Sequence, residues 1–402
     1  MSDFIPLLPN SLSPEEVGAL PPLKLFDPRS TSFIESLSAH LMQKKESRTY
    51  PELMALAYWM RKANIERIKS YMMSRSQGLF LVPRGTVLHF APSNVDTIFI
   101  YSWFLSLLVG NKNIVRISSK TSVQTEILIS SISEVLSQDS HKDVKLRTLL
   151  LRYGRDQSTT KRLSSVCDVR AIWGGDGSVQ EIRKIPIPPT STEVAFANKY
   201  SLAIIGASEW IKASESDRQA LAESFYNDSF WFDQMACSSP RLVCWLGDSQ
   251  SAETASSDFW VRVDKRLKYY DHRYPDVDYV NKLVAADMLS IESNVRICSA
   301  TNNDIVRVWL EKPALHMNFH CGAGLFFEAV LHSLDDLLPI LNRSVQTVSY
   351  AAIDPAVFRD FVATKPLAGI DRIVPFGQAL DFSPVWDGFD LMRVFTREIT
   401  IT

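Results

Sequence analysis

The sequence predicts an α/β protein with two successive units, each built on a parallel sheet that helices cover on both faces. The chain has 402 residues, of which 46% are hydrophobic. At about 150 residues per domain, this length suits two to three domains with sizeable cores. From Gly78 onward, short apolar segments alternate with segments of helical periodicity, and a second run of this kind begins near Phe225. Strands that alternate with helices are typical of parallel sheets.

Helices are expected before Gly78. Ser13 and Glu16 form a capping box around Pro14, a combination that marks the first turn of a helix. Apolar residues then recur at helical spacing in two stripes. The stripes are Phe33, Ile34, Leu37 and Leu41, followed by Leu53, Leu56, Ala57 and Met60. We expect residues 1–75 to form a helical segment that packs on the first α/β unit.

Strands and helices are expected to alternate in both units. In the first unit, the expected strands are 79–91, 113–118, 147–153 and 168–175, and the expected helices are 96–109 and 122–136. In the second, the expected strands are 241–247, 324–331 and 345–353, and the expected helices are 252–268 and 334–341. The junction is expected between Lys212 and Phe232, after a Pro-rich connector at 185–192.

Charge and hydropathy exclude several classes of function. The 43 Lys and Arg residues nearly balance the 45 Asp and Glu residues, which leaves a net charge of −2 and no bulk attraction to nucleic acid or anionic lipid. The longest apolar run, residues 97–110, has fourteen residues, whereas a membrane-spanning helix needs about 20. No secretory signal is visible at the start of the chain. The five cysteines have no paired spacing, which fits a reducing cytoplasm.

Cys237 is a candidate nucleophile. It lies in the segment FDQMACSSPR, residues 232–241, between small residues, and Pro240 blocks helix continuation before the next expected strand. A thiol at such a turn suits covalent catalysis, because a thioester forms and cleaves readily and holds an acyl group between two steps. From spacing alone, the alternative of a small buried apolar residue is the stronger one for Cys237, and more so for the other cysteines.

Asn94 is a candidate hydrogen-bond donor. It lies at a strand-to-helix turn, in the segment HFAPSNV at residues 89–95. There its amide can donate to an oxyanion that develops on a substrate. The local alternative, an ordinary turn or helix-capping asparagine, is the stronger one.

Two further segments have the residue types of a nucleotide site. Arg116, Ser118, Ser119 and Lys120 end an expected strand, where hydroxyl and cationic groups bind ribose or phosphate. A solvated loop is the alternative. In WGGDGS, residues 173–178, glycines let the backbone approach a diphosphate at the start of the following helix. That segment matches neither G-x-G-x-x-G nor the Walker pattern, so it indicates a nucleotide only weakly.

No metal site is expected. His316 and His320 have i, i+4 spacing beside Cys321, but no further ligand completes a zinc pattern. Serine hydrolase chemistry lacks its local motif, because the sequence has no G-x-S-x-G.

Taken together and in this order, these segments resemble the acyl-CoA reductase family, a branch of the aldehyde dehydrogenase superfamily. The family is typified by the fatty-acid reductase subunit of bacterial bioluminescence. The matching stretches lie between about residue 78 and residue 394. They are HFAPSNV, GNKNIVRISS, NKYSLAII, FDQMACSSPR, RIVPFGQALDF and PVWDGFDL.

The resemblance implies an aldehyde-dehydrogenase-like fold. A Rossmann-like dinucleotide-binding domain is expected at 76–225 and an α/β catalytic domain around the cysteine at 226–370, with the active site in the cleft between them. The C-terminal segment, 371–402, is expected to return to the cofactor domain, and its terminal REITIT to pair with a neighbouring subunit in a homo-oligomer.

The resemblance also assigns roles to residues. Cys237 becomes the nucleophile, and Asn94 with the backbone amide of Cys237 holds the oxyanion. A further set is implied to contact the dinucleotide, with Glu328 on the nicotinamide ribose. The set is Arg116, Ser118, Ser119, Gly174, Gly175, Ser178 and Glu328.

Two departures from the superfamily pattern bear on the chemistry. Oxidising members carry a glutamate base in the stretch that is SLAIIGAS here, at 201–208, and this stretch has no carboxylate. An acyl-Cys237 then persists instead of being hydrolysed, unless Glu209 or another acid reaches it. NAD-selective members commonly have an acid where this chain has Ser119 and Lys120. Hydroxyls and cations accept a 2′-phosphate, so NADPH is expected, with NADH as the alternative.

The expected activity is NAD(P)H-dependent reduction of an acyl thioester to the aldehyde, through an acyl-cysteine and a thiohemiacetal. The expected acyl donor is an acyl-CoA, an acyl-carrier protein or a partner acyltransferase. The alternatives are an aldehyde-oxidising dehydrogenase, an acyl-phosphate reductase and a non-catalytic acyl-binding subunit.

Overall fold

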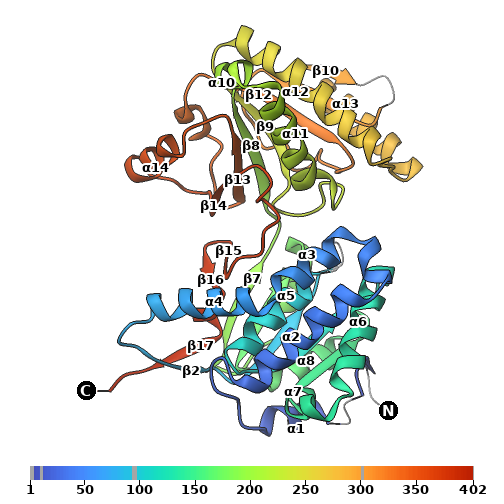
Figure 1. Ribbon diagram of the computed structural model, residues 1–402, viewed down its shortest axis with the longest axis vertical. Coiled ribbons are helices and arrows are strands. Elements are labelled where there is room, and N and C mark those ends of the chain that lie inside the picture. The colour runs from blue at the N-terminus through green and yellow to red at the C-terminus, as the bar shows by residue number, and fades with distance from the viewer. Residues whose placement is uncertain (1–3, 10–11, 93–96, 300–302, 402) are drawn as a thin grey trace. The chain divides into compact units, whose positions relative to one another are not determined.

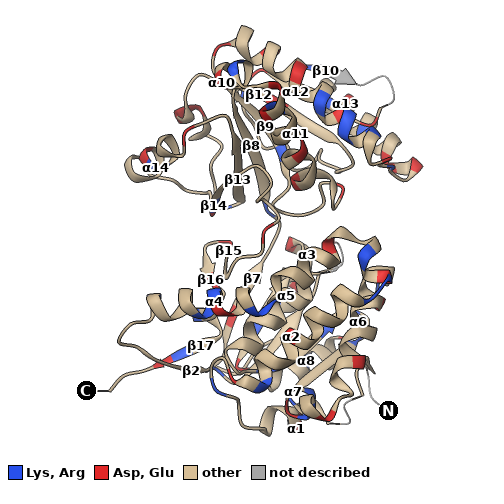
Figure 2. Cartoon of the chain, in the orientation of Figure 1, with Lys and Arg blue, Asp and Glu red and all other residues tan. Residues whose placement is uncertain are grey.

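The chain folds into two compact units. The computed structural model describes residues 4–9, 12–92, 97–299 and 303–401. Unit 1 consists of Met1–Asn198 with Phe382–Thr402, and unit 2 is Lys199–Asp381. Figure 1 shows the C-terminal segment of unit 1 in red, beside the blue and teal elements of the same unit. Acidic and basic residues are interspersed over the helices of both units (Figure 2), in line with the balanced composition.

The expected helices of unit 1 follow its short first strand, β1 (Ile5–Pro6). They are α1 (Pro14–Ala19), α2 (Pro28–Gln43), α3 (Pro51–Trp59) and α4 (Lys62–Arg75), with a short 3₁₀ turn at Glu46–Thr49. The capping box of Ser13 and Glu16 is present at the start of α1. Helix α2 packs against α3 and α6 (Val123–Leu136). The apolar stripe of α2 therefore forms a packing face, as its spacing predicts.

The sheet of unit 1 has six strands in the order β1-β5-β4-β3-β6-β7. The strands are β1 (Ile5–Pro6), β3 (Thr86–Phe90), β4 (Lys112–Ile117), β5 (Thr148–Arg152), β6 (Val169–Trp173) and β7 (Thr192–Phe196). Only β1 runs antiparallel to its neighbour. The connecting helices include α5 (Ile98–Leu108), α7 (Lys142–Leu146), α8 (Gln157–Ser165) and α9 (Asp176–Arg183).

Both faces of this sheet are covered, as successive residues of β3 show. Leu88 and Phe90 join a buried cluster with Leu163 of α8 and Val179 of α9. His89 points to the other face, where its Nδ1 lies 2.8 Å from the hydroxyl of Ser102 in α5. Side chains alternate across a strand, so a strand covered on both faces is apolar almost throughout.

The extended segment expected at 79–91 is two strands. β2 (Phe80–Pro83) pairs with β17 (Thr396–Ile399) near the C-terminus, and β3 enters the main sheet. Gly85 separates them with a φ of +136°, a conformation that favours glycine. An added Cβ there would lie 2.0 Å from Oδ2 of Asp168, the oxygen that accepts from the backbone N–H of Thr86.

Unit 2 has a seven-stranded sheet in the order β10-β11-β12-β9-β8-β13-β14. The strands are β8 (Tyr200–Gly206), β9 (Pro240–Leu246), β10 (Val295–Ser299), β11 (Val306–Leu310), β12 (Leu325–Leu331), β13 (Val345–Ala351) and β14 (Arg372–Pro375), and only β10 is antiparallel. The helices are α10 (Ala207–Lys212), α11 (Glu215–Phe230), α12 (Ser249–Tyr269), α13 (Asp276–Glu292) and α14 (Pro355–Thr364).

Helices cover both faces of the second sheet. Ala203 and Ile205 of β8 pack in one cluster with residues of α10, α11 and α12. Leu202 and Ile204 pack in another cluster with residues of α13 and α14. The stretch 276–310, which contains α13, β10 and β11, was not anticipated, because its apolar residues do not form a single clear run. Residues 334–341 form only a 3₁₀ turn at Leu334–Leu337.

The division between the units precedes the expected junction. It falls at Asn198 and Lys199, whereas the sequence placed it between Lys212 and Phe232. The reason is that β8 pairs with β9 and β13. Strand β8 therefore belongs to the second sheet, together with α10 and α11. The C-terminal return to unit 1 begins at Phe382, later than the expected residue 371.

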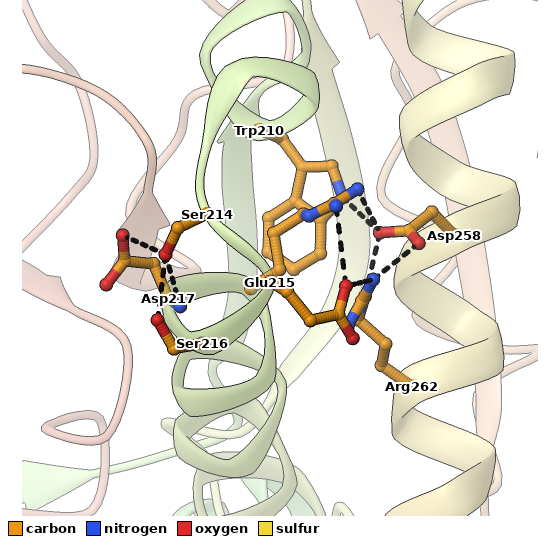
Figure 3. Close-up of polar contacts among 8 residues, drawn as sticks. Trp210, Ser214, Glu215, Ser216, Asp217, Asp258 and Arg262 are labelled. Atoms are coloured by element: carbon orange, nitrogen blue, oxygen red, sulfur yellow. Dashed lines mark hydrogen bonds and ion pairs between the residues drawn. The ribbon is translucent and has the colours of Figure 1, made fainter.

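A polar network fastens α11 to α12 (Figure 3). The Arg262 guanidinium donates to Glu215 at 2.6 and 2.7 Å and to Asp258 at 2.8 and 2.9 Å. The indole N–H of Trp210, on α10, donates to the Asp258 carboxylate at 3.0 Å. The network orients the first turn of α11, the helix that leads to the Cys237 segment.

Gly85→Ala is expected to lower the free energy of unfolding by about 1–3 kcal/mol, because a β-carbon strains the backbone and displaces Asp168. Urea unfolding of both proteins measures this difference. Gly154→Ala is the matched control, because nothing lies within 4 Å of its added Cβ. Equal stability of Gly85→Ala and wild type would contradict the assignment of Gly85 as a required left-handed residue.

Candidate active site

Cys237 lies in the turn between α11 and β9, with its side chain partly exposed. The turn is tight because Asp233 and Gln234 both have positive φ, 49° and 60°. Pro240 begins β9, one residue before the expected start of this strand at Arg241. The turn therefore presents a thiol beside the amino end of a buried strand.

A buried amide holds this turn in place. The side chain of Gln234 is fully buried. Its Nε2 donates to the carbonyls of Pro240 at 3.2 Å and Leu325 at 3.1 Å, and its Oε1 accepts from the N–H of Gly324 at 2.7 Å. These bonds attach the turn to the starts of β9 and β12.

The loop before β12 also contacts the Cys237 turn directly. The carbonyl of Asp233 accepts from the N–H of Ala323 at 2.9 Å. Gly322 has a φ of +77°, and an added Cβ there would lie 2.6 Å from that carbonyl oxygen. A residue with a side chain at position 322 would push the two loops apart.

Side chains from two neighbouring strands reach Cys237. The Ser201 hydroxyl, on β8, donates to the Cys237 carbonyl at 2.7 Å and accepts from the backbone N–H of Thr347 at 3.2 Å. Gln346, on β13, points its Nε2 at the Cys237 Sγ at 3.3 Å. The thiol therefore lies at the amino ends of β8, β9 and β13, where strand geometry fixes the groups around it.

Arg241 places a cation near the thiol. Burial lowers the pKa of Arg241, while its attraction to Tyr200 and Cys237 acts in the opposite direction. Its guanidinium lies 5.7 Å from the centre of the Tyr200 ring. Burial and the charge of Arg241 lower the pKa of His320 well below its usual value, so that imidazole is neutral. Arg241 is thus a partly buried cation at the end of the sheet where Cys237 lies.

Glu209, the acid that could replace the missing glutamate base, lies at the opposite end of β8 from Cys237. Glu209 is exposed on α10 and pairs with Lys212 at 2.7 Å. Helix α10 follows the carboxyl end of β8, whereas Ser201, which holds Cys237, is at its amino end. At about 3.3 Å per residue, the seven residues of β8 separate the two ends by roughly 20 Å.

Asp228 connects the helix before Cys237 to the C-terminal motif RIVPFGQALDF. Its carboxylate accepts from the N–H groups of Gly377 at 2.7 Å and Ala379 at 3.0 Å. Its backbone carbonyl accepts from the Ser239 hydroxyl at 2.7 Å. Burial raises the pKa of Asp228 to about 7, although the two N–H groups favour the ionised form.

Glu328 lies in the core of unit 2. Its carboxylate is fully buried and accepts from the indoles of Trp245 and Trp260 and from the hydroxyl of Ser256, at 2.7–2.9 Å. Arg307 adds an ion pair at 3.3 Å. Burial raises the pKa of Glu328. Because these groups already bind the buried carboxylate, Glu328 is not part of the cofactor site proposed below.

The other candidate cofactor residues follow parallel strands of unit 1. Gly174 and Gly175 follow β6, Gly175 caps α9 and Ser178 lies in its first turn. Ser118 and Ser119 follow β4. Strand β3 separates β4 from β6, so both groups lie at the same edge of the sheet, where α/β folds bind nucleotides.

Two contacts limit which groups at this edge of the unit 1 sheet are available to a dinucleotide. Arg116 donates to the Tyr153 carbonyl at 3.1 Å and lies over the Tyr153 ring, so its guanidinium is directed to β5. The Asp176 carboxylate accepts from the N–H of Asn198 at 3.0 Å beside the start of α9. The open first turn of α9 and the hydroxyls after β4 nevertheless fit a dinucleotide. Asn94 lies outside the described residues.

The described residues also bear on metals and membranes. Within them, no group of three or more His, Cys, Asp or Glu side chains could hold a metal ion. None of the helices in those ranges is both long enough and apolar enough to cross a bilayer.

The family model for acyl-CoA reductase (LuxC) matches residues 27–398. The chain belongs to this family. A long-chain acyl-protein thioester reductase of Aliivibrio fischeri is 25% identical over 300 residues, which cover 73% of this chain and 59% of the relative. A long-chain acyl-protein thioester reductase 2 of Photobacterium leiognathi is 24% identical over 323 residues, 79% of this chain and 63% of the relative. The chain thus spans about three fifths of the length of these relatives.

Solved structures confirm the aldehyde-dehydrogenase-like fold of this LuxC-family chain. An NAD-dependent benzaldehyde dehydrogenase from Corynebacterium glutamicum superposes with a TM-score of 0.63 at 12% identity, over 96% of this chain and 86% of that one. The glyceraldehyde-3-phosphate dehydrogenase GapN from Methanocaldococcus jannaschii, complexed with NADP, has a TM-score of 0.65 at 11% identity, over 96% and 91%. At these identities the likeness concerns the fold alone.

Several residues around Cys237 were missed in the sequence. They are Ser201, Asp228, Gln234 and Gln346. Their signal was weak but present, because Ser201 and Gln346 are polar residues inside otherwise apolar strand segments, a pattern that often marks a buried hydrogen bond.

The pKa of Asp228 predicts a pH dependence of stability. A folded pKa of about 7, above the unfolded value, means that the folded state binds the extra proton between about pH 4 and pH 7. Protonated Asp228 makes its full contribution to the free energy of unfolding below about pH 4. This contribution is lost as the pH rises through 7. Asp228→Asn is therefore expected to flatten the slope of unfolding free energy against pH in this window, measured by urea unfolding. An unchanged slope would contradict the raised pKa.

Proposed function

We propose that this chain reduces an acyl thioester to the aldehyde through an acyl-Cys237 intermediate. The observation that carries the proposal is the partly exposed Cys237 thiol, fixed at the amino ends of three strands in a member of the acyl-CoA reductase family. Cationic Arg241 favours the thiolate. The relatives from Aliivibrio and Photobacterium are named for acting on acyl-protein thioesters, which supports the thioester class.

In the proposed reaction, Cys237 Sγ attacks the acyl carbonyl. The new S–C bond forms as the bond to the donor thiol breaks, and the donor thiol leaves. NADPH or NADH, when bound, supplies the hydride that reduces an acyl group to the aldehyde level. Cys237 then leaves as a thiolate and releases the aldehyde from its thiohemiacetal. Asn94 is proposed to donate to the carbonyl oxygen whenever it carries charge.

We propose that the cofactor is held by the edge of unit 1 formed by Ser118, Ser119, Gly174, Gly175 and Ser178. NADPH is preferred in this proposal, because Ser119 with the neighbouring lysine replaces the acid that would repel a 2′-phosphate. The contacts of Arg116 direct it toward β5, so its part is limited to shaping the edge.

The acyl donor is proposed to be an acyl-CoA or an acyl group carried on a protein. A reducing, cytoplasmic setting is supported by Cys167, Cys244 and Cys321, which form no disulfide within the described residues. A homo-oligomer is supported by the exposed apolar side chains of β2 and β17, with Phe80 at 57% and Ile399 at 39% exposure.

Cys237→Ala is expected to abolish aldehyde formation, because no sulfur remains to form the thioester. The experiment incubates the protein with an acyl-CoA and follows Cys237 by peptide mass spectrometry, before and after NADPH. An adduct on Cys237 that NADPH discharges supports the proposal. The buried Cys244→Ala is the matched control and should keep the adduct and the activity. Undiminished aldehyde output from Cys237→Ala would overturn the proposal.

Asn94→Ala is expected to lower kcat for aldehyde formation by about 10²- to 10³-fold, the usual effect of losing one oxyanion donor. Steady-state kinetics with acyl-CoA and NADPH measure this effect. The loss should be less severe than in Cys237→Ala, and full turnover would rule out the oxyanion role.

A further inference from the structure

Gln346 is the side chain that contacts the Cys237 sulfur from the neighbouring strand. It lies on β13 with only 2% of its surface exposed, and its Nε2 is 3.3 Å from Sγ. Thr347 Oγ1 donates to Gln346 Oε1 at 3.3 Å. In this arrangement the oxygen of the amide faces the hydroxyl and its N–H groups face the sulfur.

The place of Gln346 is set by the sheet rather than by a loop. Strand β13 pairs with β8 on one side and β14 on the other. The same β8 fixes the Cys237 carbonyl through Ser201, and Ser201 also accepts from the backbone N–H of Thr347. The backbone of Cys237 and the partner of its sulfur are thus tied to adjacent strands, which keeps their separation constant.

We propose that Gln346 is a catalytic residue that stabilises the Cys237 thiolate by donating a hydrogen bond from Nε2. This proposal rests on the proposed function, in which Cys237 is the nucleophile. Hydrogen bonds to a charged acceptor are stronger than those between neutral groups. The bond therefore favours the thiolate over the thiol. A glutamine amide neither gains nor loses a proton in this role, so it stabilises the anion without activating water.

The bond acts at both ends of the reaction. When Sγ attacks, it forms a bond to the acyl carbon, the donor thiol departs with the electrons of its own carbon–sulfur bond, and Sγ loses its charge. When the thiohemiacetal collapses, the Sγ–C bond breaks, the hydroxyl proton leaves to solvent, and Sγ regains the charge. Gln346 stabilises the thiolate before the first step and after the last.

Several charged and titratable groups lie near this end of the sheet. Arg241 on β9 is the cation near the sulfur, and its guanidinium lies over Tyr200 of β8. Burial and the charge of Arg241 lower the pKa of His320. Lys199 and Asp371 pair with each other at 2.9 Å. A variant at position 346 leaves these charges in place, so its effect reports on the amide.

The test measures the rate of Cys237 alkylation by iodoacetamide against pH, with peptide mass spectrometry to identify the modified residue. Gln346→Met removes the donor at similar length, and it is expected to raise the midpoint by about one to two pH units, the equivalent of one hydrogen bond to a charged group. Gln346→Glu keeps the shape and adds a like charge, so its midpoint should rise at least as far. Ser349→Ala, on the same strand, is the control and should match wild type.

The outcomes separate this proposal from the proposed function. An unchanged midpoint in Gln346→Met overturns the role of Gln346. An unchanged midpoint in Gln346→Glu overturns it too, because a like charge in contact with the sulfur must raise the midpoint. The measurement needs neither acyl donor nor NADPH, so a failed reductase assay does not affect it. In an active enzyme, the acid limb of the kcat/KM profile for aldehyde formation should move upward with the alkylation midpoint. A limb that stays in place would also contradict the proposal.

Discussion

The geometry of the candidate site depends on the buried amide of Gln234. The Cys237 turn has two successive left-handed residues and cannot make the ladder hydrogen bonds of a strand. Gln234 supplies three bonds instead, to Pro240, Gly324 and Leu325, each worth about 1 kcal/mol net in a protein interior. Leaving those backbone groups unpaired would cost more, since they are buried.

The hydrogen bonds of Gln234, together with those of Ser201 and Gln346, hold the thiol at the ends of strands. The turn is attached to β9 and β12 by Gln234, to β8 by Ser201, and to β13 by Gln346. Asp228 extends the attachment to the C-terminal motif. A thiol held from four strands has little freedom, and a fixed position would favour attack on a bound carbonyl. The packing of unit 2 therefore suits the proposed role of Cys237 as a nucleophile.

The sequence predicted those parts of the fold that depend on local residue patterns. Apolar strands such as 113–118 and 345–353, the capping box of Ser13, and the turn before Pro240 were all found. Long-range contacts have no local signal, and this accounts for the misses. Nothing around Gln346 indicates that it will meet a sulfur more than a hundred residues earlier in the chain. Likewise, Glu328 sits in an apolar strand, and only the structure reveals the indoles that surround it.

The central claim is that the acyl group on Cys237 leaves by reduction and not by hydrolysis, because β8 contributes no carboxylate and Glu209 lies at its other end. The most direct measurement isolates the acylated protein and divides it into two portions, one with NADPH and one without. The account predicts that the acyl group persists without NADPH and is recovered as aldehyde with it. Prompt release of free acid in both portions would contradict the account.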